Sequence, residues 1–185
     1  MKTHVDMEKV LFSKEEISEK VAEVAKQIST DYEGKNPLLI CVLKGASVFF
    51  VDLIREISID IEMEFMSVSS YGNSTQSSGR VKIEKDVGID LTGRNVIIVE
   101  DIVDTGNTLF NLRKLLSARG ASDVKICCLL DKPSRRTADI KPDYVCFSIP
   151  DEFVIGYGLD YAEKYRNLDC VGVIKSSVVM GSSSK

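Results

Sequence analysis

Histidine is almost absent from this sequence, in which His4 is the only one among 185 residues. A Ser-His-Asp triad and a zinc site of histidine and cysteine both need a histidine within the fold, so neither is expected here. Long apolar runs are absent too. No stretch approaches the length of a membrane-spanning helix, and the first eight residues lack the apolar core of a secretory signal. We therefore expect a cytoplasmic protein without a membrane partner.

Cysteine pairs and basic clusters are also lacking. The net charge is −4 and the Lys and Arg residues are scattered, so no nucleic-acid-binding surface is expected. The cysteines are odd in number, form no C-x-x-C pair and lie in apolar, strand-like runs, which predicts reduced, buried thiols. They are Cys41, Cys127, Cys128, Cys146 and Cys170.

What the chain does contain is a regular alternation of apolar strands and amphipathic helices. Ser13 opens a capping box for a helix that is expected to end near Asp31. Such alternation favours one α/β domain over residues 1–185, with a mostly parallel, twisted sheet flanked by helices. Further helices are expected at 46–56 and up to Arg119, and strands at Leu38–Leu43, 57–68, 80–85, 96–99, 124–130, 144–147 and Val171–Ile174.

In sheets of this kind, ligands bind beyond the carboxyl ends of the strands. Loops start at such ends after Leu43, Val68, Val99 and Leu130, and we expect them to converge on one site. The N-terminal segment and roughly residues 148–185 do not continue the alternation. We expect them to form a small hood lobe over this edge of the sheet, with a frayed tail at 180–185.

Residues 95–110 are the most informative segment. An apolar strand is followed by the carboxylates Glu100, Asp101 and Asp104, by a turn of small residues, and then by a helical pattern. Backbone N–H groups and the dipole at a helix N-terminus favour an anion, and Gly106 permits close approach or positive φ. The segment matches neither a Walker A loop nor a dinucleotide-binding fingerprint. A phosphate carried on a sugar fits better, because the acids suit a ribose diol, a proton transfer or Mg²⁺.

This segment closely resembles the phosphoribosyl-diphosphate motif of the type I phosphoribosyltransferases. Its Glu-Asp pair, followed by Asp104-Thr105-Gly106, resembles their 6-oxopurine branch. The resemblance covers the chain from about Val5 to Ile174. It implies the family's sheet with a hood lobe and a homodimer or homotetramer. It also implies purine salvage, in which 5-phosphoribosyl 1-diphosphate and Mg²⁺ convert hypoxanthine or guanine to IMP or GMP.

The resemblance also implies a role for each residue of the motif. Asp104 holds or takes the proton at N7 of the purine, whereas the alternative is an acid that only complements the helix dipole. Glu100 and Asp101 lie at the ribose hydroxyls and Mg²⁺, although neighbouring strand residues point to opposite sides, so only one is expected to reach the hydroxyls. The 5′-phosphate cradle is Asp104, Thr105, Gly106, Asn107, Thr108 and Leu109.

Two other segments resemble parts of the family's diphosphate site. Leu43, Lys44 and Gly45 are implied to bind the diphosphate together with Arg166, with a cis peptide between the first two; the alternative is a plain strand-to-helix turn. The long polar stretch 69–79 corresponds to a flexible lid, and its alternative is a surface hairpin without a catalytic part. The lid begins with Ser70 and Tyr71.

The resemblance implies a purine site built from residues between 132 and 160. Lys132 donates to O6 of the purine, which selects oxo over amino bases. Phe153 stacks on the base, where the alternative is a core aromatic, and the backbone of Val154 reads the purine edge. Asp160 resembles the residue that holds a second Mg²⁺.

Some questions stay open at this stage. Asp131, where relatives often have a small apolar residue, either pairs with Lys132 or faces outward, and Arg135 and Arg136 are expected at an interface or sheet edge. A xanthine-preferring transferase fits the same motifs. A regulator that keeps the fold and binds nucleotide or RNA is the alternative from another class, and the acidic charge balance counts against it.

Overall fold

The computed structural model describes residues 4–70 and 81–181. Six strands form one sheet in the order β4-β3-β2-β5-β6-β7, and its neighbours are parallel except for β3 and β4. This confirms the predicted mostly parallel α/β sheet. The strands are β2 (Leu38–Leu43), β3 (Glu62–Ser70), β4 (Val81–Lys85), β5 (Asn95–Val103), β6 (Asp123–Asp131) and β7 (Tyr144–Ser148).

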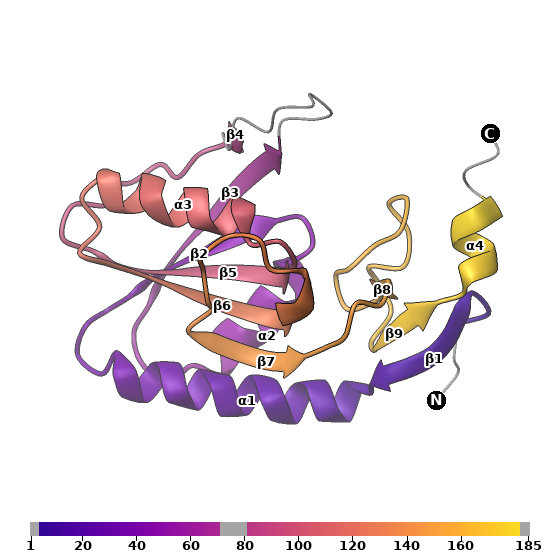
Figure 1. Cartoon of the computed structure of the whole chain (residues 1–185). Coiled ribbons are helices and arrows are strands. Elements are labelled where there is room, and N and C mark those ends of the chain that lie inside the picture. The colour runs from indigo at the N-terminus through magenta and orange to yellow at the C-terminus, as the bar shows by residue number, and fades with distance from the viewer. Residues whose placement is uncertain (1–3, 71–80, 182–185) are drawn as a thin grey trace.

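Helices cover both faces of this sheet, as Figure 1 shows. In β5, Val96 and Ile98 belong to the apolar cluster of α3, whereas Ile97 and Val99 belong to the cluster of α1 and α2. The run from Val96 to Val99 is apolar at every position because successive residues are buried on opposite faces. The helices are α1 (Lys14–Asp31), α2 (Ser47–Glu56), α3 (Asn107–Ala118), the 3-10 turn η1 (Pro133–Arg135) and α4 (Ser176–Gly181).

Several local predictions are confirmed within the described residues. Ser13 and Glu16 form the capping box of α1, which ends at Asp31. All five cysteines are buried and free, and burial raises the pKa of Cys41 to about 12. No helix in the ranges 4–70 and 81–181 has the length and apolar character to cross a bilayer.

Three elements differ from the sequence predictions. β3 begins at Glu62, because residues 57–61 link α2 to the sheet and place alternate isoleucines against the core. β5 continues to Val103 by pairing with β6, so Glu100 and Asp101 lie on the strand instead of after it. The segment expected to fray begins inside α4, which extends to Gly181, and residues 182–185 lie outside the described part.

A second, small sheet joins the two ends of the chain. β1 (Met7–Phe12), β9 (Val171–Ile174) and β8 (Val154–Ile155) pair antiparallel in that order. Figure 1 shows this sheet beyond the carboxyl ends of the large sheet's strands, where the sequence placed the hood lobe. We call residues 156–168, between β8 and β9, the hood loop. The division into one domain with a hood lobe stays a prediction.

Candidate active site

The turn between β5 and α3 lines a cavity of about 310 Å³ at the carboxyl edge of the sheet. Gly106 is the N-cap of α3 with φ +81, and no side chain of the described residues caps the helix there. A Cβ on Gly106 would press against Ile140 and Arg136. The position therefore requires glycine. The N–H of Asn107 donates to Thr105 Oγ1 at 3.4 Å, and the N–H groups of Thr108 and Leu109 stay available to an anion.

Most of the predicted 5′-phosphate cradle lines this cavity. The exception is Asn107, whose side-chain amide donates to Thr137 Oγ1 at 3.2 Å and so ties the start of α3 to the following segment. The lining residues offer main-chain N–H and hydroxyl groups, which suit a phosphate ester, together with the Asp104 carboxylate. The lining members of the cradle are Asp104, Thr105, Gly106, Thr108 and Leu109.

The opposite wall is the loop after β2, which contributes Leu43, Lys44 and Gly45. The peptide bond between Leu43 and Lys44 is cis, as the family resemblance implied. A Cβ on Gly45 would overlap the Asp101 carboxylate, so only glycine permits this contact. β2 and β5 are neighbours, but the helices that follow them, α2 and α3, pack on opposite faces of the sheet. The cavity therefore lies at the topological switch point, where sheets of this type bind ligands.

The adjacent acids Glu100 and Asp101 both line the cavity. That only one of them reaches the ribose hydroxyls stays a prediction. Burial raises the pKa of both carboxyl groups, and the charge of Asp101 raises that of Glu100 further. Against this, the N–H of Ile102 donates to Asp101 Oδ1 at 2.6 Å. Two neighbouring carboxylates removed from water attract a cation or a proton.

A second cavity of about 210 Å³ adjoins the first and shares Asp101, Ile102, Asp104 and Asp160 with it. Phe153 is 51% exposed and lines this cavity, so it is not a core aromatic. Lys132 is a buried cation whose Nζ lies 3.7 Å from Asp151. The remaining lining residues suit a flat, partly polar ring: Lys132, Phe153, Val154 and Leu159.

Arg135 and Arg136 both contact Asp104, and their expected place at an interface or sheet edge stays a prediction. Arg135 Nε donates to Asp104 Oδ1 at 3.0 Å, and Arg136 Nη1 donates to the Asp104 carbonyl at 2.8 Å. Asp131 neither pairs with Lys132 nor faces outward, because its carboxylate accepts from Arg136. The physical reason is the 3-10 turn η1, which folds residues 135–138 back over the turn between β5 and α3, where Thr105 O accepts two N–H groups.

The hood loop contributes Asp160 and Arg166 to the first cavity. Arg166 Nη2 lies 2.8 Å from Asp160 Oδ1, while its Nε is buried without a partner. Sequence reasoning missed Glu163, whose Oε2 accepts from Lys44 Nζ at 3.1 Å and lies 3.5 Å from Arg166 Nη2. A single carboxylate thus bridges the two cations predicted to bind the diphosphate.

The predicted lid is described only at its start. Ser70 is the last residue of β3, and Val68 on the same strand lines the first cavity. β3 therefore ends beside the site. Tyr71 and the rest of the predicted lid, up to residue 79, lie outside the described residues.

The donor set is suited to Mg²⁺ delivered with a substrate. Within residues 4–70 and 81–181, no group of three or more His, Cys, Asp or Glu side chains could hold a metal. Mg²⁺ commonly uses one or two carboxylates together with phosphate oxygens and water, and so needs no such group. Asp101 and Asp160 lie at both cavities, and Glu100 lies at the first. Asp160 Oδ2 accepts from the N–H of Glu163, and its Oδ1 lies 2.8 Å from Arg166 Nη2, so both oxygens already have a partner.

Comparison with known proteins agrees with this geometry. The phosphoribosyl transferase domain matches residues 10–162. The hypoxanthine-guanine phosphoribosyltransferase of Streptococcus thermophilus is 56% identical over 173 residues, which are 94% of this chain and 96% of that protein. A crystal structure of a hypoxanthine phosphoribosyltransferase from Staphylococcus aureus has a TM-score of 0.90 at 45% identity over 94% of both chains. A structure of the Trypanosoma cruzi hypoxanthine phosphoribosyl transferase has a TM-score of 0.95 at 41% identity over the whole of both chains. The chain therefore belongs to the phosphoribosyltransferase family, on the branch of its hypoxanthine-guanine members.

Proposed function

We propose that this protein transfers the phosphoribosyl group of 5-phosphoribosyl 1-diphosphate to hypoxanthine or guanine, giving IMP or GMP and diphosphate. The observation that carries the proposal is the position of Asp104, which lines both the phosphate cavity and the cavity of Lys132 and Phe153. A nucleotide with its phosphate in one cavity and its base in the other has its glycosidic bond near this carboxylate.

Four groups act on the base. Asp104 accepts the proton of N7 as the bond to the sugar forms, which is general base catalysis. Lys132 donates to O6, and because a buried ammonium has no acceptor, it disfavours the amino group of adenine. Phe153 stacks on the ring, and the backbone of Val154 contacts its edge.

Other groups act on the sugar and the leaving diphosphate. Positive charge develops on the ribose as the diphosphate departs, and Glu100 and Asp101 stabilise it while accepting from the ribose hydroxyls. Lys44, Gly45 and Arg166 bind the diphosphate, and the unpartnered Nε of Arg166 supports an anionic ligand there. Mg²⁺, held by Glu100, Asp101 and Asp160, would neutralise charge on the diphosphate when bound.

We further propose a lid beginning at Ser70 and Tyr71, a cytoplasmic location and a homodimer or homotetramer. The buried, unpaired thiols support a reducing compartment. Light scattering on the purified protein measures the oligomer, and a monomer at working concentration would contradict that part of the proposal.

Initial rates with hypoxanthine, guanine, xanthine and adenine, each with 5-phosphoribosyl 1-diphosphate and Mg²⁺, test the reaction. Hypoxanthine and guanine are expected to be the efficient substrates. A preference for xanthine would keep the mechanism and correct the base. Turnover of adenine without any turnover of oxopurines would overturn the assignment. RNA binding at physiological salt, which we do not expect, would favour a regulator.

A further inference from the structure

The hood loop lies directly against the loop proposed to bind diphosphate. A Cβ on Gly158 would overlap the carbonyl oxygen of Gly45, so the two backbones are in contact. Gly45 in turn contacts the carboxylate of Asp101. These three groups form a stack without room for a side chain between them. A shift of the hood loop therefore moves Gly45 relative to the acid beside it.

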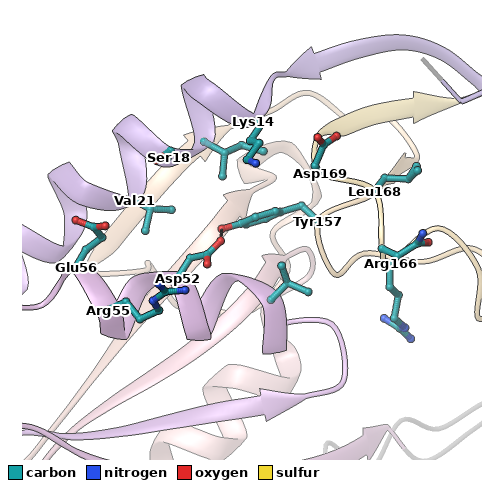
Figure 2. A pocket seen from close by; sticks show the side chains of 13 residues that line it. Lys14, Ser18, Val21, Asp52, Arg55, Glu56, Tyr157, Arg166, Leu168 and Asp169 are labelled. Carbon is teal, nitrogen blue, oxygen red and sulfur yellow. Dashed lines mark hydrogen bonds between the residues drawn. The ribbon is translucent and has the colours of Figure 1, made fainter. Parts of the chain in front are cut away.

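Tyr157 fixes the hood loop next to this stack. It has φ +50, and its N–H donates to the carbonyl of Leu168 at 2.9 Å. Its side chain is only 6% exposed and lies at the wall of a cavity of about 660 Å³ between α1, α2 and the hood loop. Figure 2 shows the phenol directed toward Asp52 of α2, to which it donates at 2.6 Å. Burial raises the pKa of Tyr157, and Asp52 raises it further, so the hydroxyl stays a donor.

Asp52 lies on α2, which follows the proposed diphosphate loop directly in the chain. α2 begins at Ser47, and the N–H of Ser47 donates to the carbonyl of Lys44 at 3.1 Å. On the hood side, Arg166 Nη1 donates to the carbonyl of Gly158, the residue after Tyr157, at 2.8 Å. The bond between Tyr157 and Asp52 therefore joins the two backbone segments that carry Lys44 and Arg166.

We infer that Tyr157 and Asp52 are positioning residues for diphosphate binding, which hold Gly158 and Arg166 against Lys44 and Gly45. The inference rests on the proposed function and names two residues outside the substrate cavities. The base and the 5′-phosphate do not depend on this bond. β8 is fixed by pairing with β9, and the 5′-phosphate cradle belongs to the large sheet.

The test separates ligands with and without a diphosphate. Tyr157→Phe removes only the hydroxyl, and calorimetric titrations with 5-phosphoribosyl 1-diphosphate plus Mg²⁺ and with GMP measure both affinities. The Kd of 5-phosphoribosyl 1-diphosphate is expected to rise about tenfold, the effect of one hydrogen bond to a charged group, and that of GMP by less than about twofold. Asp52→Ala is expected to behave like Tyr157→Phe, whereas Asp52→Asn keeps an acceptor and is expected to bind like the wild type.

Tyr144→Phe is the matched control. Tyr144 is 8% exposed and donates to Asp31 Oδ2 at 2.8 Å, but this bond lies at the start of β7, on the edge of the sheet opposite the site. Both tyrosine variants are expected to melt at similarly lower temperatures, and Tyr144→Phe should retain wild-type affinities.

Two results would overturn the inference: unchanged binding of 5-phosphoribosyl 1-diphosphate by Tyr157→Phe and Asp52→Ala, or equal weakening of GMP. A wild-type protein that binds neither ligand would instead refute the proposed function, and the inference would fall with it.

Discussion

The two halves of the candidate site are built differently. On the sheet side, the loops after β2 and β5 contain one described residue of positive φ, Gly106. In the hood loop, six residues have positive φ, and four of them are not glycine: Tyr157, Ala162, Glu163 and Tyr165. Strand pairing fixes the sheet side, whereas the hood loop depends on local hydrogen bonds to its own backbone. We therefore expect sheet-side substitutions to change chemistry and hood substitutions to change geometry.

Asp104→Asn provides the largest expected effect and tests the sheet side. Turnover should fall by about 10²–10⁴-fold, the usual range for one acid–base group, because the amide cannot accept the purine proton. Binding of 5-phosphoribosyl 1-diphosphate and the melting temperature should change much less. Steady-state rates, titration and thermal unfolding measure the three quantities, and unchanged turnover would remove Asp104 from its role.

Gly158→Ala tests the hood side. Gly158 has φ +98, and the new methyl group would overlap Gly45 O, so we expect kcat/KM to fall by about a hundredfold, as backbone strain of 1–3 kcal/mol implies. Gly93→Ala is the control for strain alone, because Gly93 has φ +72 and nothing within 4 Å of its Cβ position. Both variants should melt earlier, and only Gly158→Ala should lose activity. Equal activities would show that the contact with Gly45 is dispensable.

Lys132→Ala tests whether the two cavities bind different parts of the substrates. Loss of one charged hydrogen bond should weaken the use of hypoxanthine about 10- to 100-fold, because O6 loses its donor. Binding of ribose 5-phosphate, which occupies the cradle alone, should stay unchanged. Measured losses of equal size for both ligands would contradict a role in reading the base.

Glu163→Gln should have the smallest effect, and it should strengthen ligand binding where the other variants weaken binding or activity. Lys44 and Glu163 are 69% and 67% exposed, and ion pairs this exposed to solvent contribute little. Freed from the carboxylate, the two cations should bind 5-phosphoribosyl 1-diphosphate up to about fivefold more tightly at low salt. Glu23→Gln, which breaks an exposed pair on α1, is the control. Weaker binding by Glu163→Gln would mean that the carboxylate positions the cations.

The sheet side of the site could be predicted from the sequence, whereas contacts between segments far apart in the chain could not. Asp104, Gly106 and α3 are neighbours in the chain, so their geometry follows from a local strand–turn–helix pattern. The ion pair of Asp131 and Arg136 depends on how η1 folds over another turn, which local patterns do not encode. Glu163 was missed because it reaches Lys44 from 119 residues away, through a backbone of positive φ. β8 was missed because two residues are too few to show a period.

The pairing of β8 with β9 has a consequence for synthesis of the chain. The ribosome completes β7 before β8, and the partner that anchors Val154 emerges only with β9. A nascent chain that ends before β9 thus already contains the proposed 5′-phosphate cradle and Lys132, while Val154 still lacks its partner strand. Of the proposed contacts to the base, those from Phe153 and Val154 are thus the last to be anchored as the chain is made.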